Sequence, residues 1–386
     1  MPRVLVVYQH LPHYRRDVFR ELESTEGWEF HFAAGASSRD PGIATMTATD
    51  LHHVHVLDNV WLGPFLWQRG LFRLLRQPWD HVILLGDVAY LSTWAAAAEL
   101  RARKKRVAFW TIGWHRPESG LRRRIRLAFY SLADQLLLYG SDAQRLGAAA
   151  GYPADRMSVV GNSSSAPPTN LEEDDARLAE IDRALSEVAQ PAVGAVIRLT
   201  SRKRLDLLID AVALLEREGG PRLAVVLAGD GPEATPLREQ ARALGVDLHL
   251  LGPIYGERAL ERFYGTCLTT VVPSLAGLTT LQSLKYGRPV ITHDDPMEQV
   301  PEYEAIRPGS TGDLYVKGDL EDLAKVIAFW VNQMQVAPAE VAAACREAVQ
   351  DGWTPAASAF RIVEALAGER AAEPMPVPFA NRKGCQ

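Results

Sequence analysis

Two groups of residues in the second half of the chain have the types and spacing of a phosphate site. Arg198 and Lys203 lie five residues apart after an apolar run, and small residues around Gly277 open a helical pattern. The first turn of a helix has N–H groups without intrahelical acceptors, and these attract anions. Two cations facing such a helix start would stabilise the negative charge that grows on a leaving diphosphate. The pattern therefore predicts a diphosphate site.

The elements that must position these residues follow an α/β pattern. Short apolar runs alternate with helical patterns in both halves, which predicts parallel sheets wrapped by helices. We expect two doubly wound, Rossmann-like domains that face a cleft, with ligands at the carboxyl ends of the strands. The strands are expected near 3–8, 29–33, 81–85, 106–110, 135–138, 157–160, 192–198, 222–228, 247–251, 268–272 and 288–292. The helices are expected near 14–24, 66–76, 90–103, 119–132, 141–150, 203–218, 233–244, 257–265, 277–286, 319–334, 338–349 and 355–367.

The predicted domain limits follow from breaks in this pattern. Residues 1–165 form the first domain, a polar and Pro-containing stretch over 166–190 is the linker, and 191–352 form the second domain. The last helix, in 353–371, is expected to return to the first domain, and 372–386 to be a surface tail.

The charge and composition of the chain limit the classes of protein to which it can belong. The chain has 386 residues, is 47% hydrophobic and has a net charge of −5. Residues 1–165 hold 20 Lys and Arg against 15 Asp and Glu, so the rest holds 22 against 32. No nucleic-acid-binding module accompanies the basic half, so nucleic acid is not expected as a partner. We expect a cytoplasmic protein with three reduced thiols, because the start lacks a signal-peptide layout and no apolar run reaches 18 residues.

The second half resembles the donor domain of GT-B glycosyltransferases, specifically the retaining family 4 (glycosyl transferases group 1). The resemblance covers most of 190–315, and its motifs come in the family's order. They are Arg198-Leu199 with Lys203, Ala228-Gly229-Asp230-Gly231-Pro232, Leu251-Gly252-Pro253-Ile254, and Pro273-Ser274 followed by Gly277-Leu278 and Gly287-Arg288-Pro289-Val290-Ile291.

This resemblance implies a nucleotide-diphosphate sugar of the UDP, GDP or dTDP type as co-substrate, with no other cofactor and no metal. It assigns Arg198 and Lys203 to catalysis. The donor-binding residues that it implies are Gly229, Gly231, Pro253, Ile254, Gly277, Leu278, Thr279, Thr280 and Gln282. The chain departs from the family at two glutamates that usually bracket this loop, where Ser274 and Gln282 stand instead. The chain therefore resembles a divergent member of this family, with donor identity open.

The first half resembles the family more loosely. Pro12-His13-Tyr14-Arg15 is similar to a Pro-x-Tyr-Arg start that replaces the commoner glycine-rich loop. Without those glycines a backbone cannot approach a ligand closely, so side chains should make the contacts. We assign His10, His13, Tyr14 and Arg15 to acceptor binding, and His115 to the catalytic histidine that follows a strand of this domain. The run His52-His53-x-His55 lacks metal-ligand spacing and indicates a half-buried strand.

The predicted function is the transfer of a hexose-type sugar to an acceptor hydroxyl, with retention and without a metal. The acceptor is a glycan, a glycolipid or a small molecule, in polysaccharide or glycolipid assembly or in the decoration of a secondary metabolite. The basic segment Arg122–Arg126 is either a solvated helix face or a contact with an anionic membrane surface, so membrane association stays open. Two alternatives are a nucleotide-sugar epimerase of the same fold and an inactive sugar-nucleotide-binding protein.

Overall fold

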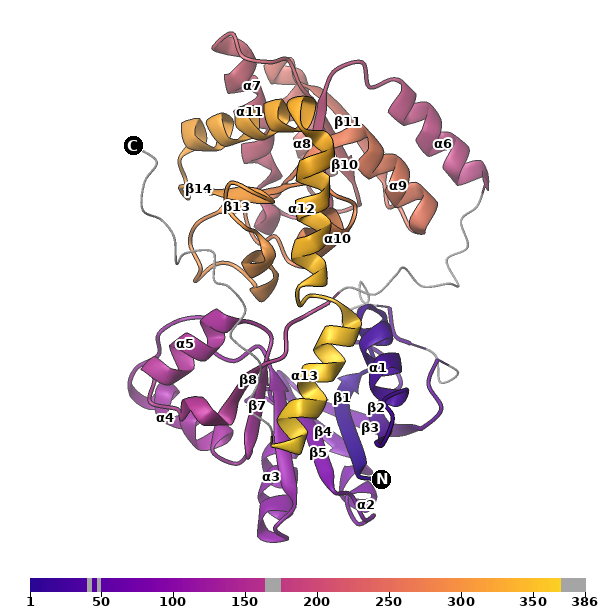
Figure 1. Cartoon of the computed structure of the whole chain (residues 1–386), viewed down its shortest axis with the longest axis vertical. Coiled ribbons are helices and arrows are strands. Elements are labelled where there is room, and N and C mark those ends of the chain that lie inside the picture. The colour runs from indigo at the N-terminus through magenta and orange to yellow at the C-terminus, as the bar shows by residue number, and fades with distance from the viewer. Residues whose placement is uncertain (40–43, 47–49, 164–174, 369–386) are drawn as a thin grey trace. The chain divides into compact units, whose positions relative to one another are not determined.

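The computed structural model (Figure 1) describes residues 1–39, 44–46, 50–163 and 175–368. These fall into two units. The first comprises the described residues up to 163 together with 354–368, and the second comprises 175–353. The segment 166–174 of the predicted linker and the predicted tail, 372–386, lie outside the described residues.

The first unit is built on an eight-stranded sheet of order β4-β3-β2-β1-β5-β6-β7-β8. All neighbouring strands are parallel except β3 and β4, which form an antiparallel hairpin. The strands are β1 Arg3–His10, β2 Glu29–Gly35, β3 Val54–Leu62, β4 Phe65–Arg69, β5 His81–Leu85, β6 Arg106–Thr111, β7 Gln135–Leu138 and β8 Met157–Val159. The helices are α1 Arg16–Glu23, α2 Leu71–Leu74, α3 Leu91–Ala102, α4 Gly120–Tyr130, α5 Ser141–Ala149 and α13 Pro355–Ala367.

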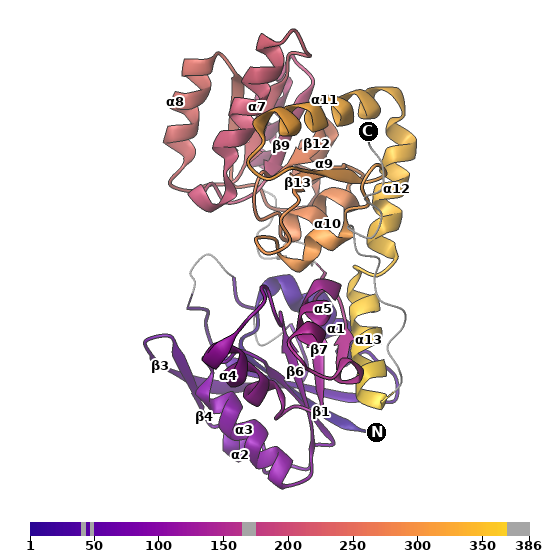
Figure 2. The same cartoon turned by 90° about the vertical axis from the view of Figure 1, so that its left-hand side faces the viewer.

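Two hydrophobic layers cover the two faces of this sheet. Residues of α2, α3, α4 and α5 bury one face, and residues of α1 and α13 bury the other. Figure 2 shows α3 and α13 on opposite sides of the strands. Ile362 of α13 is fully buried in the same cluster as Phe19 of α1. Helix α13, the last helix among the described residues, is therefore part of the first unit.

The second unit is a fully parallel six-stranded sheet of order β11-β10-β9-β12-β13-β14. Its strands are β9 Ala192–Val196, β10 Ala224–Ala228, β11 Asp247–Gly252, β12 Cys267–Val271, β13 Val290–His293 and β14 Gly312–Tyr315. Its helices are α6 Asp175–Ser186, α7 Leu205–Arg217, α8 Ala234–Leu244, α9 Glu257–Thr266, α10 Leu278–Lys285, α11 Leu320–Val336 and α12 Pro338–Gln350. The prediction of two α/β domains built on parallel sheets is confirmed.

Two sequence predictions were wrong in detail. The helix expected at 66–76 is the second strand of the β3–β4 hairpin followed by the single turn α2. The reason is the turn at Gly63 and Pro64, where Gly63 has φ +57, and the alternating burial of β4 after it. The linker expected over 166–190 contains α6, whose Leu178, Ile181 and Leu185 repeat at helical spacing and pack into the core against α9.

Candidate functional site

The strand order of the second unit selects one edge of its sheet as a ligand site. From β9 the chain builds outward through β10 and β11, and then returns to place β12 on the other side of β9. In open α/β sheets, ligands bind at the carboxyl ends of the strands where the order reverses in this way. That point lies between the end of β9 at Val196 and the end of β12 at Val271.

Two hydrogen bonds join the segments that follow these two strands. Lys203 is the last residue of the short 3₁₀ helix Ser201–Lys203, and its Nζ donates to the carbonyl oxygen of Leu275 at 2.5 Å. The hydroxyl of Thr279, in the first turn of α10, donates to the carbonyl oxygen of Val196 at 3.0 Å. The predicted cation and the predicted helix start are therefore neighbours.

The loop that precedes α10 is held through its own carbonyl groups. Tyr315 donates from its hydroxyl to the carbonyl oxygen of Pro273 at 2.6 Å, and Thr292 donates to that of Ser274 at 2.8 Å. Both donors come from the neighbouring strands β13 and β14. The loop is thus fixed through its carbonyl oxygens. At the start of α10, the Thr280 N–H donates to the carbonyl oxygen of Gly277 at 2.9 Å, while the N–H groups of Leu278 and Thr279 come before the first intrahelical acceptor.

The helix start itself combines an unusual backbone with partial exposure. Gly277, the N-cap, has φ +54, a left-handed conformation that glycine adopts at little cost. Leu278 and Thr279 are partly exposed, whereas Thr280 is fully buried. Three of the four residues predicted at this turn are therefore accessible to a ligand, and Thr280 is a core residue.

Gln282 has a partner that the sequence did not indicate. The hydroxyl of the buried Tyr264 donates to Oε1 of Gln282 at 3.1 Å. The amide is therefore oriented by α9, with its oxygen engaged. Its NH₂ group is the part that can donate to a ligand.

The electrostatics around Lys203 favour anion binding. Its pKa is lowered to about 8, first because the side chain is largely buried, and further because Arg202 and Arg198 lie nearby. The carboxylate of Glu302 acts in the opposite direction. These cations repel one another because they lie close together and are partly removed from water. A bound diphosphate would reduce this repulsion.

Glu302 was missed by the sequence analysis. It is buried in the 3₁₀ helix Pro301–Ala305 and is close enough to influence the pKa of Lys203. Its position, about ten residues after a strand, carries no recognisable signal. A proline at the start of the short helix was the only hint that this segment is ordered.

The glycines of the Gly229–Gly231 turn are required by the close approach of two backbones. A Cβ at Gly229 would lie 1.9 Å from the carbonyl oxygen of Ile197, and one at Gly231 would lie 2.1 Å from that of Leu199. The Leu199 N–H also donates to the carbonyl oxygen of Asp230 at 2.9 Å. This turn therefore supports the loop that holds Arg198, an exposed residue of the site.

The loop after β11 has one buried and two exposed residues. Ile254 is buried in the core with α6 and α9, while Pro253 is exposed. Tyr255, which the sequence analysis passed over, leaves 53% of its surface exposed. Arg177 of α6 donates to the carbonyl oxygens of Leu251 and Pro253 and fixes this loop.

In the first unit, the predicted acceptor residues lie at the end of β1 and directly after it, next to the point where the strand order reverses between β1 and β5. Arg15 is buried, and its guanidinium lies 4.8 Å from the ring of Trp110 and 4.4 Å from that of Tyr139. His10 is also buried, whereas His13 and Tyr14 are partly exposed and their rings contact each other edge to face. The pKa of His13 is lowered, mainly by desolvation.

His115 lies on the loop after β6 and is exposed. Partial desolvation and the nearby Arg126 and Arg116 lower its pKa, so the neutral imidazole is favoured. The loop is tied down by Arg126, which bonds Glu118 at 2.7 Å and the carbonyl oxygen of Gly113 at 3.3 Å.

The basic segment Arg122–Arg126 is only partly available to a partner. Arg126 is used inside the unit, and Arg123 donates to the carbonyl oxygen of Ala150 at 2.8 Å. Arg122 and Arg124 are exposed, next to Leu121, which is 72% exposed, but Arg122 also forms an ion pair with Glu118 at 3.1 Å. Across the described residues, no helix is both long and apolar enough to cross a membrane.

The histidine run near residue 53 lies at the start of β3. His55 belongs to this strand, and the rings of His53 and His55 stack on that of His31 in β2, with centroids 4.4 and 5.5 Å away. Among the residues that the structure describes, no group of three or more His, Cys, Asp and Glu side chains could hold a metal ion.

The sequence of the second half is similar to known glycosyltransferases. Residues 179–350 match the family of glycosyl transferases group 1. A stretch of 107 residues is 40% identical to the glycogen synthase of Paracoccus denitrificans (strain Pd 1222). That stretch is 27% of this chain, and the match spans 22% of the relative's length.

Solved structures agree over nearly the whole chain. HepE from Anabaena, in complex with UDP, superposes with a TM-score of 0.71 at 16% identity, covering 95% of this chain and 100% of that one. The lipopolysaccharide outer core galactosyltransferase WaaB gives a TM-score of 0.67 at 16% identity, covering 95% and 99%. A glycosyltransferase from Rickettsia africae gives 0.71 at 12% identity, covering 95% and 97%. At these identities the likeness establishes the GT-B fold, and the match to glycosyl transferases group 1 lies within the second unit.

Proposed function

We propose that the chain is a glycosyltransferase that moves a hexose-type sugar from a nucleoside-diphosphate donor to an acceptor hydroxyl, with retention and without a metal. The observation that carries the proposal is Lys203, a partly buried cation whose Nζ bonds the loop in front of α10 at the switch point of the sheet. The family match over 179–350 supports it. The HepE structures with UDP and with UDP-glucose favour a UDP-type donor, with GDP and dTDP as the alternatives.

In the proposed reaction, the bond between the anomeric carbon and the diphosphate oxygen breaks, and the acceptor oxygen bonds to that carbon from the same face. The acceptor proton leaves with the diphosphate. Lys203, Arg198 and the N–H groups at the start of α10 stabilise the charge on the leaving group. Such preorganised donors act most strongly where water is excluded.

The remaining donor contacts are assigned by position. The NH₂ group of Gln282 would donate to a ribose hydroxyl, because Tyr264 occupies its oxygen. Pro253 and Tyr255 would border the nucleobase, with the exposed ring of Tyr255 as a stacking surface. The other predicted donor residues would hold the site in shape without contacting the donor, since they are buried or packed against backbone. They are Ile254, Thr280, Gly229 and Gly231.

The acceptor is assigned to the first unit. His13 and Tyr14 are the partly exposed candidates there, and the ring-stacked Arg15 would position them. His115, with its lowered pKa, would act as a neutral hydrogen-bonding group toward the acceptor. The acceptor class is a glycan, a glycolipid or a small molecule. Arg122 and Arg124, with Leu121 beside them, would provide a peripheral contact to an anionic membrane surface for a cytoplasmic enzyme.

The test is a thermal-shift screen of nucleotide sugars, because a ligand that binds the native state raises its stability. Turnover of the best binder is then measured with and without added acceptors. Lys203→Ala and Arg198→Ala should each lower turnover by about 10²-fold or more, the loss typical of one preorganised charge-stabilising donor. Arg238→Ala is the matched control, because Arg238 is an exposed arginine of α8.

Three outcomes separate the candidate functions. Transfer to an added acceptor supports the proposal. Interconversion of free donors would identify an epimerase, and binding without turnover would identify an inactive sugar-nucleotide-binding protein. Near-normal turnover of folded Lys203→Ala and Arg198→Ala would show that the donor site is elsewhere.

A further inference from the structure

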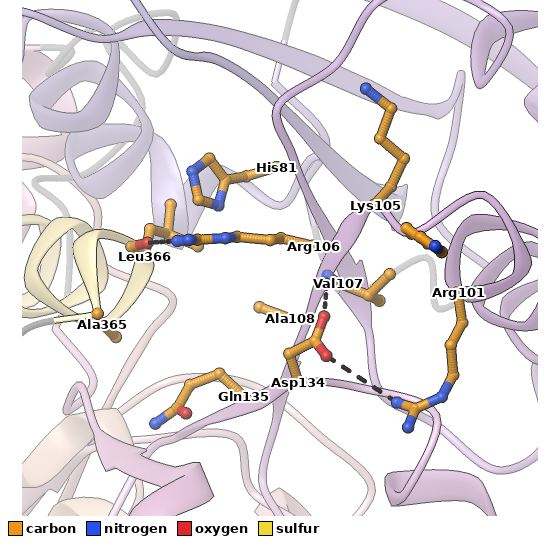
Figure 3. Close-up of a pocket in the computed structure, with 12 residues that line it drawn as sticks. His81, Arg101, Lys105, Arg106, Val107, Ala108, Asp134, Gln135, Ala365 and Leu366 are labelled. Carbon is orange, nitrogen blue, oxygen red and sulfur yellow. Dashed lines mark hydrogen bonds and ion pairs between the residues drawn. The ribbon is translucent and has the colours of Figure 1, made fainter.

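The first unit has a cavity at the edge of its sheet opposite the carboxyl ends of the strands. It measures about 490 Å³, a size typical of small-molecule sites. The starts of β5, β6 and β7, the turn after α3 and the end of α13 line it. Figure 3 shows the side chain of Arg106 running from the start of β6 toward Leu366 of α13, with His81 beside it.

The charged side chains that line this cavity are mostly cations. Arg101, Lys104, Lys105 and Arg106 face a single carboxylate, that of Asp134, which leaves a formal charge of +3. Asp134 is already engaged, since it accepts the Val107 N–H at 2.9 Å and lies 3.9 Å from Arg101. The cavity therefore has more positive charge than its own carboxylate neutralises.

The two lysines are the least engaged of the four cations. Arg101 donates to the carbonyl oxygen of Ser131 at 3.2 Å, and Arg106 donates to that of Leu366 at 3.5 Å. Within the described residues, the structure gives neither Lys104 nor Lys105 an ion pair. Two ammonium groups beside a cavity, without carboxylates of their own, are available to an anionic ligand.

The backbone at Lys104 adds an independent observation. Helix α3 ends in a turn where the Lys105 N–H donates to the carbonyl oxygen of Leu100 at 2.9 Å, and Lys104 has φ +56. Glycine is the usual residue at this left-handed position after a helix, because it has no Cβ to strain the backbone. A lysine here is less favourable locally than glycine. Such strain is often retained where a side chain has a function.

We propose that this cavity binds a small soluble anion with at least two phosphate groups. Two phosphates, at about −1.5 to −2 charges each, match the excess positive charge of the lining. The site does not rest on the proposed transfer reaction, because all of its residues belong to the first unit.

A different role for these cations would be to offset the negative end of the α3 dipole. The two roles predict opposite effects of Lys104→Gly. A lysine that serves the helix stabilises the fold, so its removal would lower the melting temperature. If Lys104 instead serves a ligand, Lys104→Gly should have the same melting temperature as the natural chain or a higher one, because glycine adopts φ +56 without strain.

The experiment is isothermal titration of the full chain with inorganic pyrophosphate, on the natural chain and on Lys203→Met, in which the proposed donor site is weakened. The cavity site should titrate in both proteins with the same affinity. Lys104→Gly and Lys105→Gln should each weaken binding by about 10-fold or more, the order expected for one lost charge-assisted hydrogen bond. Arg124→Gln removes an equal charge from α4, outside the cavity, and should leave the Kd within about 2-fold.

Four results would overturn the proposal. They are a flat titration at millimolar pyrophosphate, equal loss of affinity in the Arg124→Gln control, full affinity in both lysine variants, and a lower melting temperature for Lys104→Gly. Retention of the chain on vesicles of anionic phosphatidylglycerol, together with a flat pyrophosphate titration, would identify a membrane contact instead.

Discussion

The affinity of the chain for UDP should fall as the pH rises through about 8, because Lys203 loses its proton there. The pKa of this lysine is lowered to about 8 by burial and by the neighbouring Arg202 and Arg198. If only the charged lysine binds the diphosphate, the dissociation constant rises with the neutral fraction. For a pKa of about 8, this gives a loss of about 10-fold between pH 7 and pH 9.

The assay is a series of UDP titrations by calorimetry over that pH range, on the natural chain and on Lys203→Met. Methionine matches the four-atom apolar stem of the lysine side chain but lacks the terminal ammonium group. Any titration of the nucleotide itself appears in both proteins, so the difference between the two curves isolates Lys203. A natural chain whose affinity is flat with pH, or parallel to that of Lys203→Met, would refute the placement of this lysine at the diphosphate.

The same pKa gives a check on folding. Because the folded-state pKa lies below the ordinary value of 10.5, the unfolded chain holds the proton more tightly. Charged Lys203 therefore opposes folding below about pH 8, and this opposition is relieved as the pH rises from about 8 to 10.5. Lys203→Met should accordingly melt no lower than the natural chain at pH 7. If Lys203→Met loses UDP affinity while its melting curve is unchanged, the loss is due to the missing charge and not to unfolding.

Three further outcomes are expected. Gly231→Ala should lower the free energy of urea unfolding by about 2 kcal/mol or more, because the Cβ of the alanine would lie 2.1 Å from the carbonyl oxygen of Leu199. Unchanged stability would mean that the two backbones can separate. Ile362→Ala should lower the free energy of unfolding by about 2–5 kcal/mol, because Ile362 is fully buried, whereas Phe360→Ala should lower it far less, because Phe360 is 61% exposed. Equal losses would show that α13 does not dock through Ile362. Transfer activity should survive excess chelator, because Arg198, Lys203 and a helix start supply the positive potential; complete loss that Mg²⁺ or Mn²⁺ restores would contradict metal independence.

The repeating patterns of the sequence were enough to predict the fold. Apolar runs of five to eight residues and helical periods are local properties of the chain, and most strands and helices lie within a few residues of their predicted limits. The errors came where a local pattern was ambiguous. Trp61 to Gln68 combines an apolar content that suits a helix with a Gly-Pro turn that makes a hairpin, and the polar helix α6 lies in a stretch that begins with prolines and serines.

The sequence by itself also indicated which residue types could bind a diphosphate, because Arg198, Lys203 and the Gly277 turn have a recognisable order. It could not show how their side chains are engaged. The bond from Lys203 to Leu275, the bond from Tyr264 to Gln282 and the influence of Glu302 each join residues from different elements. Likewise, the sequence does not show that the cations at the end of α3 line a cavity, because the other walls come from β5, β6, β7 and α13. Burial, pKa and the closure of a cavity depend on which segments meet across the sheet, and only the tertiary structure decides that.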